Sequence, residues 1–515
     1  MKRQFLLLIC LLSCCVSSAL ANVQPAAIFN DGMVLQRDKP VPVWGRADAG
    51  EVVTVRFGAQ TQQATTDKSG VWRVNLKPLR ANATPAALII EGKNRIELKN
   101  ILVGEVWMCA GQSNMALRLG ESLNGKEVAA GANFPQMRVF APAHKLATAP
   151  GQDVTGQWVT VTPATAAGIT AVGFYFAHDL QDKLKVPLGL IDTSWGSTSA
   201  EAWTPIEYLA ARDELRSTIA IMKVWEKERD TVKARFDQQL ADWRAAVEKA
   251  KNEGQPAPER PIVPDALRPE RAAGILYNSL IAPLIPYALR GVIWYQGENN
   301  GDRATQYRVL LPTMIRAWRE RWGAGDFPFG IVQLPGRWPP PTQVEDRPWS
   351  YLRDAQLYTY QTVPRTGLTV TIDVGDANDG HPKNKKPVGE RLARWALADA
   401  YGYKLVKSGP VYASSVVRGK EIFLKFKDIG GSLSSRDGGA LQQFTIAGAD
   451  RVWHWAQARL VNKNTVAVWS DEVAAPVAAR YAWAGNPVSA NLSNDSKLPA
   501  SPFRTDDWPE IKSKK

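Results

Sequence analysis

The order of apolar and polar residues along the chain separates two β-rich ends from a mixed centre. Residues 24–100 hold short apolar runs divided by Pro, Gly and Asp at the spacing of strands and turns, which predicts a small sandwich or barrel. The same kind of pattern returns in residues 406–510. We therefore expect a second β-module there, or strands that complete the first.

Strand-like runs alternate with helical patterns in the centre of the chain. Apolar runs end in polar, glycine-containing loops, and helical periodicity marks residues 171–184, 306–323 and 387–402. This alternation predicts an α/β domain whose parallel sheet is covered by helices on both faces. Ligands of such sheets bind beyond the carboxyl ends of the strands, which is where the polar loops of this chain fall.

One long segment interrupts the alternation. Residues 206–253 carry apolar residues at steps of three and four between densely charged positions, and the Pro-rich stretch 255–268 ends the pattern. We expect a helical hairpin inserted into the α/β domain, either as a structural prop or as a wall of a ligand cleft. The predicted division is a signal segment (1–21), an N-terminal β-module (22–100), the α/β domain in two parts (101–205 and 271–405) around a helical insertion (206–270), and a C-terminal β-module (406–515).

The first residues have the pattern of a secretory signal. A basic start, an apolar run and the small-residue sequence Ala-Leu-Ala predict cleavage after Ala21, with lipoprotein processing at Cys14 as the alternative. We therefore expect a periplasmic or secreted protein. Three of the four cysteines lie in this segment, so only Cys109 remains and no internal disulfide is expected. No later stretch is long and apolar enough to span a membrane.

Composition and charge narrow the class of protein further. The chain has 515 residues, of which 45% are hydrophobic and 22% charged, as in a globular protein of several domains. The net charge is +13, but the basic residues are scattered rather than clustered beside aromatics, so we expect no nucleic-acid partner. The 19 tryptophans exceed what core packing needs, and the remainder could form platforms for sugar rings.

A serine and a histidine carry the candidate chemistry. Ser113 follows a β-type run in the glycine turn "AGQSNM". Serine is a weak nucleophile that needs a positioned base, most often histidine. Of the four histidines, His381 alone stands in a polar loop between a predicted strand and a predicted helix, at the sheet edge expected for Ser113. We therefore take Ser113 as the candidate nucleophile and His381 as its candidate base.

A histidine base also needs a group that orients its ring. Asp379, two residues before His381, is the local candidate, and Asp376 and Asp373 are nearby alternatives. Acidic residues in loops are often turn-formers, so a main-chain carbonyl remains a further alternative.

Acyl transfer requires N–H donors for an oxyanion. The backbone amides of Ser113 and Gly196 and the side-chain amides of Gln296 and Asn299 lie in three glycine loops that could converge. There is no His pair at helical spacing, no cysteine cluster and no phosphate-cradling glycine motif. The proposed chemistry needs neither a metal ion nor a cofactor.

These loops, taken in order, resemble a known family. The motifs "GQSNM", "SWGST", "WYQGENN" and "DGHPKNK", with the flanking "MVLQRDKPVPVWG" and "LPASPFRT", are similar to the SGNH hydrolases and, more narrowly, to the sialate O-acetylesterase group of carbohydrate esterases. The resemblance runs from about residue 27 to 505. It implies a flavodoxin-like three-layer α/β/α SGNH hydrolase domain with added β-modules.

The resemblance also implies roles for individual residues. It makes Ser113 the nucleophile and His381 the base, with oxyanion donors from Ser113, Gly196 and the "QGENN" loop. The chain departs from the superfamily pattern at Asn378, where an acid usually stands three residues before the histidine. Asp354 stands where the group often has Glu, and the sequence assigns it no role.

The implied activity is that of a secreted carbohydrate O-acetylesterase working through an acetyl-enzyme. Its partner would be an acetylated glycan, either a hemicellulose such as xylan or xyloglucan or an O-acetylated sialic acid. The alternative is a non-catalytic glycan-binding protein built on the two β-modules. Oligomeric state cannot be read from the sequence.

Overall fold

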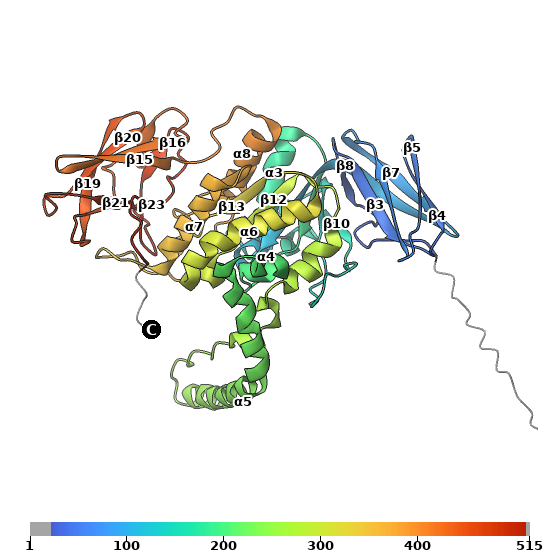
Figure 1. Ribbon diagram of the computed structural model, residues 1–515, viewed down its shortest axis with the longest axis horizontal. Helices are drawn as coiled ribbons and strands as arrows, with labels where there is room; N and C mark the ends of the chain where they lie inside the picture. The colour runs from blue at the N-terminus through green and yellow to red at the C-terminus, as the bar shows by residue number, and fades with distance from the viewer. Residues whose placement is uncertain (1–21, 511–515) are drawn as a thin grey trace, which may run out of the picture.

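The computed structural model describes residues 22–510 of the chain. The expected signal segment, with its cleavage after Ala21 and the alternative processing at Cys14, lies outside these residues. Within residues 22–510, no helix is both long and apolar enough to cross a bilayer. The described chain has β-modules at its two ends and a mixed α/β centre (Figure 1), so the predicted α/β class is confirmed.

The N-terminal module contains one separate sheet and part of the large central sheet. The separate sheet pairs β1 (Gln24–Pro25), β3 (Val41–Arg46) and β6 (Val71–Leu76). Strands β4 (Val52–Phe57), β5 (Gln60–Thr65) and β7 (Asn82–Glu91) join the central sheet through the pairing of β7 with the long strand β8 (Arg95–Gly111). Burial alternates along β4 and β6, as expected where one face of a strand packs on a core and the other meets water.

Strand β8 connects this module to the centre. Its first part pairs antiparallel with β7, while its last part lies parallel between β11 (Leu188–Asp192) and β12 (Gly291–Tyr295). Within the first part, where the pairing with β7 is irregular, Asn100 adopts a left-handed φ of 58°, a conformation that asparagine tolerates better than most residues. The expected boundary at residue 100 therefore falls inside a continuous strand, and the domain division stays a prediction.

The central strands follow the order β10-β9-β11-β8-β12-β13-β14. All neighbours from β9 to β14 are parallel, and only β10 runs antiparallel at the edge. Cys109 of β8 is buried, as expected, and it is the free cysteine of the described chain. The remaining bounds are β9 (Phe134–Phe140), β10 (Trp158–Val161), β13 (Phe329–Val332) and β14 (Thr366–Thr369).

Successive residues of these strands contribute to two separate cores. Trp107 and Ile293 belong to a core shared with α3 (Ala171–Leu184) and α8 (Lys386–Tyr401). Met108 and Trp294 belong to a core shared with α6 (Ala304–Trp322) and α7 (Pro348–Thr362). The two-residue period of a strand thus sends its side chains alternately toward two pairs of helices.

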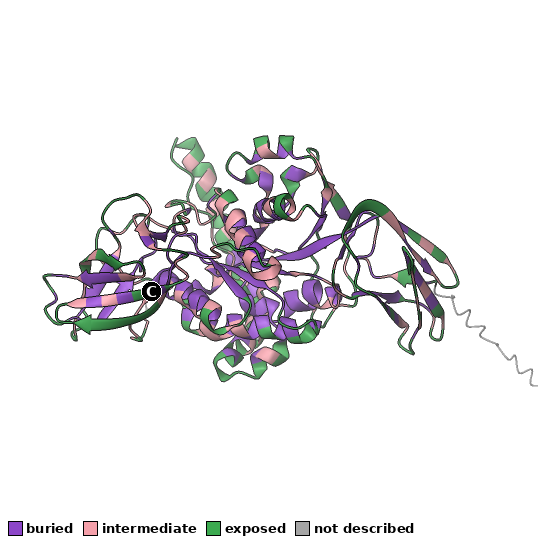
Figure 2. Cartoon of the chain, turned by 90° about the horizontal axis from the view of Figure 1, so that it is seen from above, coloured by how far each residue is buried: buried purple, intermediate pink, exposed green. Residues whose placement is uncertain are grey.

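The helical insertion differs from the expected hairpin. After α4 (Ile206–Ala210), residues 216–252 form α5 (Arg216–Asn252), one continuous helix of 37 residues. No Gly or Pro interrupts these residues, so nothing ends the helix where a hairpin would turn. Only Thr218 and Phe236 of α5 are buried, and the helix projects away from the body (Figure 1) with mostly exposed faces (Figure 2).

The C-terminal module has its own sheet and does not complete the first. Seven strands follow the order β15-β16-β20-β19-β18-β21-β23, and their neighbours are antiparallel. A separate ribbon pairs β17 (Leu433–Ser435) with β22 (Leu492–Asn494). The bounds of the seven are β15 (Val411–Arg418), β16 (Glu421–Lys427), β18 (Phe444–Ala447), β19 (Trp453–Asn462), β20 (Thr465–Trp469), β21 (Ala478–Tyr481) and β23 (Phe503–Arg504).

Candidate active site

The candidate nucleophile stands at the carboxyl end of the central strand β8. The strand ends at Gly111, whose φ is 130°, and a Cβ atom on this residue would lie 2.2 Å from the carbonyl oxygen of Tyr295. Only glycine allows β8 and β12 to approach this closely at their ends. Two residues later, Ser113 opens the short helix α1 (Ser113–Ala116) and points its hydroxyl away from the end of the sheet toward the loop after β14.

His381 comes from that loop, between β14 and α8. Its Nε2 atom lies 2.8 Å from the Oγ atom of Ser113. The His381 side chain is 51% exposed, so the pair is open to solvent on one side. The structure thus brings together two residues that are 268 positions apart in the sequence, in the arrangement that a serine nucleophile and its base require.

Three carboxylates near His381 have different surroundings. The Oδ1 atom of Asp379 accepts a hydrogen bond from the His381 backbone N–H at 2.8 Å and lies 3.4 Å from the ring Nδ1. Asp376 accepts from the backbone N–H of Asn378 and caps the turn. Asp379 is therefore the acid that faces the ring.

Asp373 is held by arginines instead. Its two oxygens accept hydrogen bonds from Arg391 at 2.8 and 2.7 Å, and Arg436 lies 2.9 Å away. Burial acts to raise the pKa of Asp373, but the two arginines outweigh it and hold the pKa below its usual value. This carboxylate links α8 to the C-terminal module rather than orienting His381.

Gly196 lies beside the nucleophile, and Asn299 keeps an unused donor. A Cβ atom on Gly196 would stand 3.6 Å from the Cβ of Ser113, so the loop after β11 runs directly past the serine. The Asn299 side chain keeps a buried amide nitrogen with no hydrogen-bond partner among residues 22–510, while its oxygen accepts from Arg271 at 3.3 Å. Asn299 therefore retains a donor for an incoming group.

The side-chain amide of Gln296, in contrast, is already hydrogen-bonded within the protein. Its side-chain nitrogen donates to the carbonyl of Thr198 at 3.2 Å and to the side chain of Asn300 at 2.8 Å, and the residue is fully buried. A role as an oxyanion donor would require these bonds to break. In this geometry Gln296 fixes the "QGENN" loop against the loop after β11.

A buried polar network beneath the pair was not found from the sequence. The Asn114 side chain donates to Glu298 and to the carbonyl of Gly380 at 2.9 Å, and its oxygen accepts from Lys385. Lys385 is 1% exposed, and this burial lowers the pKa of its amine to about 7 against the opposing attraction of Glu298 and Asp379. The hydrogen bonds of Asn114 thus connect the turn that holds Ser113 to the loop that holds His381.

His144 is a second residue that the sequence did not single out. Its ring stacks on Trp195 with the centroids 4.0 Å apart and the planes 7° from parallel, and its Nε2 lies 3.1 Å from the Ser194 carbonyl. Burial lowers the pKa of His144. Because Trp195 directly precedes Gly196, this stack supports the loop beside Ser113.

The two remaining histidines and Asp354 lie elsewhere. His178 contacts Asp179 on α3, and His454 pairs with Glu472 in the C-terminal module. Asp354 accepts from Arg308 at 2.9 Å and lies 3.4 Å from Arg504, so it joins α7 to α6 and β23. No three His, Cys, Asp or Glu side chains in the described part of the chain group as metal ligands.

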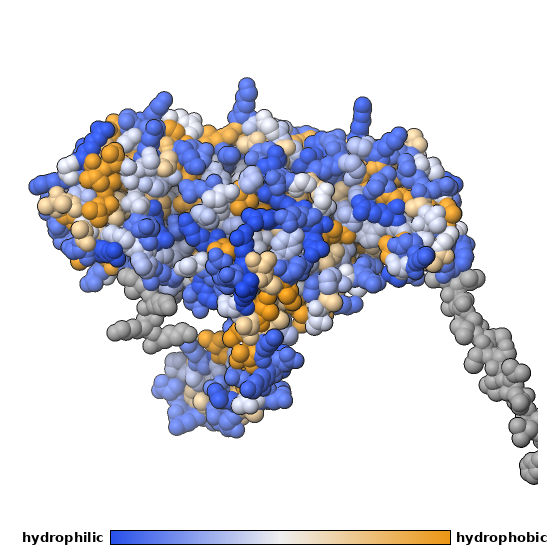
Figure 3. Space-filling view, in the orientation of Figure 1, coloured by the Kyte–Doolittle hydropathy of each residue, from blue (hydrophilic) through white to orange (hydrophobic). Residues whose placement is uncertain are grey.

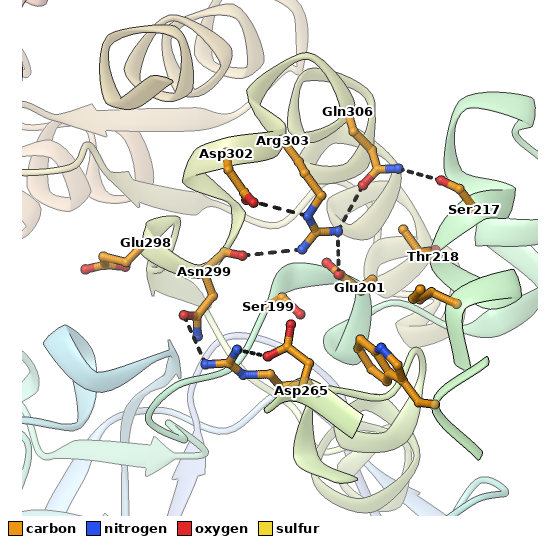
Figure 4. A pocket seen from close by; sticks show the side chains of 13 residues that line it. Ser199, Glu201, Ser217, Thr218, Asp265, Glu298, Asn299, Asp302, Arg303 and Gln306 are labelled. Atoms are coloured by element: carbon orange, nitrogen blue, oxygen red, sulfur yellow. Dashed lines mark hydrogen bonds and ion pairs between the residues drawn. The ribbon is translucent and has the colours of Figure 1, made fainter. Parts of the chain in front are cut away.

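A cavity of about 590 Å³ opens next to these loops (Figure 4). Its lining includes Glu298 and Asn299 from the loop after β12 and Arg271 from the end of the insertion. Arg271 donates through Nε to the carbonyl of Ser197 at 2.7 Å, the residue after Gly196. The cavity therefore lies against the two loops that neighbour the Ser113 turn, and it has room for a ligand larger than an acetyl group.

Comparisons with known proteins agree with this arrangement. Residues 271–398 match the family described as carbohydrate esterase, sialic acid-specific acetylesterase. The chain is 36% identical to a carbohydrate acetylesterase of known structure from Xanthomonas citri, covering 94% of this chain and 100% of that one with a TM-score of 0.80. It is 29% identical to the sialate O-acetylesterase of Rattus norvegicus over 75% of each chain, and 27% identical to that of Mus musculus over 93% of each. The chain therefore belongs to the sialate O-acetylesterase-like carbohydrate esterases and is a carboxylic ester hydrolase.

Proposed function

We propose that this chain is a secreted carbohydrate O-acetylesterase that uses Ser113 as its nucleophile within a flavodoxin-like SGNH hydrolase domain. The strand order β11-β8-β12-β13-β14 corresponds to the order 2-1-3-4-5 of flavodoxin-like sheets, with β9 and β10 as an extension of one edge. The helix pairs on either side of these strands support the same reading of the domain.

One observation carries the mechanism: the Ser113 hydroxyl lies 2.8 Å from Nε2 of His381. His381 accepts the hydroxyl proton while Oγ attacks the acetyl carbonyl carbon, whose oxygen becomes an oxyanion. When the tetrahedral intermediate collapses, the bond to the sugar oxygen breaks and His381 returns the proton to that oxygen. Water, activated by His381, then attacks the acetyl-enzyme and releases acetate with free serine.

The oxyanion is stabilised by N–H donors on the side of the serine away from the histidine. The backbone amides of Ser113 and Gly196 and the unpartnered side-chain amide of Asn299 are the donors that we propose. Asp379, with its carboxylate 3.4 Å from Nδ1, orients His381 and stabilises the imidazolium. Because both groups are about half exposed, solvent screens this contact more than it would a buried triad.

The comparisons support an acetylated carbohydrate as the substrate. Relatives carry the name sialate O-acetylesterase, and the neighbour of known structure is a carbohydrate acetylesterase. We propose an acetylated hemicellulose such as xylan or xyloglucan, or an O-acetylated sialic acid, as the substrate. The signal pattern of residues 1–21 supports a periplasmic or secreted location, with tethering through Cys14 as the alternative.

The test is acetate release by residues 22–515 and by the Ser113→Ala variant. Acetylated xylan, acetylated xyloglucan oligosaccharides, an O-acetylated sialic acid and 4-nitrophenyl acetate are offered separately. We expect Ser113→Ala to lower kcat by a factor of about 10³ or more. The control is Ser434→Ala, which changes a half-buried serine of β17 and should leave turnover intact. Full turnover by folded Ser113→Ala would refute the serine mechanism.

A further inference from the structure

The cavity lined by the loops after β11 and β12 has one wall that comes from the helical insertion. Ser217, Thr218, Ile221 and Trp225 of α5 line it, opposite the loops that follow β11 and β12. This part of α5 is anchored, because the Gln306 side chain of α6 donates to the Ser217 hydroxyl at 3.0 Å and to the Glu214 carbonyl at 3.1 Å (Figure 4). The first turns of α5 are therefore a fixed wall, although the rest of the helix projects into solvent.

The wall places apolar surface over a polar cavity. Ile221 and Trp225 are four residues apart and so lie on the same face of the helix. Ile221 is 40% exposed, and Trp225 is partly exposed. Figure 3 shows apolar surface gathered where α5 leaves the body. Ile221 and Val224 are exposed apolar residues of the first turns of this helix. Exposed apolar surface beside a polar cavity is typical of a ligand-binding wall.

The cations that line the cavity are already paired. Arg303 donates to Glu201 at 2.8 Å, to Gln306 at 3.1 Å and to the Asn299 carbonyl at 3.3 Å, as the dashed lines of Figure 4 show. Arg271 donates to Asp265, to the Ser197 carbonyl and to the Asn299 side chain. Each guanidinium among the lining residues already bonds to a carboxylate of the chain, with which an entering carboxylate would have to compete.

The charge of the cavity lining also disfavours an anionic ligand. Its ionisable residues are two arginines and four acids, the acids being Glu201, Asp265, Glu298 and Asp302. An entering carboxylate would meet paired cations and excess acidic groups, while sugar hydroxyls would find many acceptors and donors. The lining therefore suits a neutral sugar better than an anionic one.

We propose that this cavity is the subsite for a neutral sugar ring of an acetylated oligo- or polysaccharide, with Trp225 as the surface on which the ring stacks. This inference rests on the proposed esterase function and selects one of its two substrate classes. It gives α5 a specificity role: the helix binds the glycan next to the acetyl group and leaves the chemistry to Ser113 and His381.

The test compares three substrates in wild type and variants. An acetylated xylo-oligosaccharide carries neutral rings, an O-acetylated sialic acid carries a carboxylate, and 4-nitrophenyl acetate has no sugar. We expect Trp225→Ala to lower kcat/KM for the oligosaccharide about tenfold, mainly through KM, as for loss of an aromatic contact. Turnover of 4-nitrophenyl acetate should stay unchanged, because that substrate does not reach the wall.

A matched control lies on the same helix. Trp243 donates to the carbonyl of Pro258 and is not part of the cavity lining, so Trp243→Ala should leave all three substrates unaffected. Trp225→Phe keeps an aromatic face and should restore most of the oligosaccharide activity. Equal losses on all three substrates by Trp225→Ala, or no loss on the oligosaccharide, would overturn the stacking role.

The charge argument has its own variant. Asp265→Asn removes the carboxylate from Arg271 and should raise kcat/KM for the sialic acid ester about threefold relative to kcat/KM for the oligosaccharide. A wild type that prefers the sialic acid ester over the neutral oligosaccharide would refute the neutral subsite. Failure of the subsite proposal can be distinguished from failure of the esterase proposal. The esterase proposal fails if the wild type does not hydrolyse 4-nitrophenyl acetate, or if Ser113→Ala still hydrolyses it.

Discussion

Replacing Lys385 by methionine should change how the stability of this protein depends on pH. The Lys385 amine is 1% exposed, bonds to the Asn114 side chain and lies 5.2 Å from the centre of the Tyr295 ring. Burial lowers the pKa of this amine from 10.5 to about 7, and the carboxylates of Glu298 and Asp379 offset only part of the effect. The folded state therefore disfavours the charged lysine.

The sign of the effect follows from proton binding. Between pH 7 and 10.5 the unfolded lysine keeps its proton while the folded one loses it, so the unfolded state binds more protons and stability rises with pH. Below pH 7 both states are protonated and the full penalty applies. A shift of this size corresponds to about 5 kcal/mol, or about 1.4 kcal/mol per pH unit inside the window.

The assay is urea unfolding of wild type and Lys385→Met, followed by tryptophan fluorescence at pH 7.5, 8.5 and 9.5. The unfolding free energy of the wild type should rise relative to that of Lys385→Met by about 1.4 kcal/mol with each pH unit. Lys386→Met, which changes an exposed neighbour, is the control and should show a constant difference. A Lys385→Met difference that does not vary with pH would show that Lys385 is charged when folded, and would refute the reasoning.

Three further substitutions test the site and its supports. Asn114→Ala removes the hydrogen bonds that join the Ser113 turn to the His381 loop and leaves their buried partners unpaired. The free energy of unfolding, measured with urea, should therefore fall by about 2–3 kcal/mol. In steady-state kinetics, kcat should fall by a larger factor than KM changes. Asp379→Asn should lower kcat for 4-nitrophenyl acetate about tenfold, far less than the roughly 10⁴-fold loss for a buried orienting aspartate, because the carboxylate is half exposed and 3.4 Å from the ring of His381; a loss near 10⁴-fold would contradict the screened contact. Gly111→Ala should lower the melting temperature sharply, since its Cβ would lie 2.2 Å from a carbonyl oxygen of β12, and thermal unfolding that matches wild type would contradict this.

The helices of the centre were predictable where their periodicity was complete. The predicted helix over residues 171–184 coincides with α3, and those over 306–323 and 387–402 agree with α6 and α8 to within two residues. Helix α7 (Pro348–Thr362) was not predicted, because its polar residues are buried by tertiary contacts that no local pattern reveals. Arg353, for example, is fully buried among the carbonyls of Leu334, Pro335 and Ala484.

For the helical insertion, the type of secondary structure could be predicted, but not the number of helices. The three- and four-residue spacing correctly predicted helix, but it does not state how many helices the segment forms. A hairpin requires a turn, and α5 contains neither Gly nor Pro to make one. The role proposed for this segment, a wall of the cavity, depends on where the first turns of α5 pack. Gln306 of α6 holds these turns in place, and the sequence of the segment itself does not reveal this contact.

The positions of Ser113 and His381 could be predicted because topology alone brings them together. Each residue follows a strand of one parallel sheet, and the carboxyl ends of such strands meet at one edge. Their supports could not be predicted, because a buried lysine and a solvent-exposed lysine look alike in a polar loop. Gln296 and Asn299 show the same limit. These two amides stand three positions apart in one loop, but the side-chain N–H groups of Gln296 bond to Thr198 and Asn300 while those of Asn299 have no partner among residues 22–510. The order of strands and loops in the sequence therefore predicts which residues meet at the sheet edge. The role that each of these residues takes depends on contacts that only the fold creates.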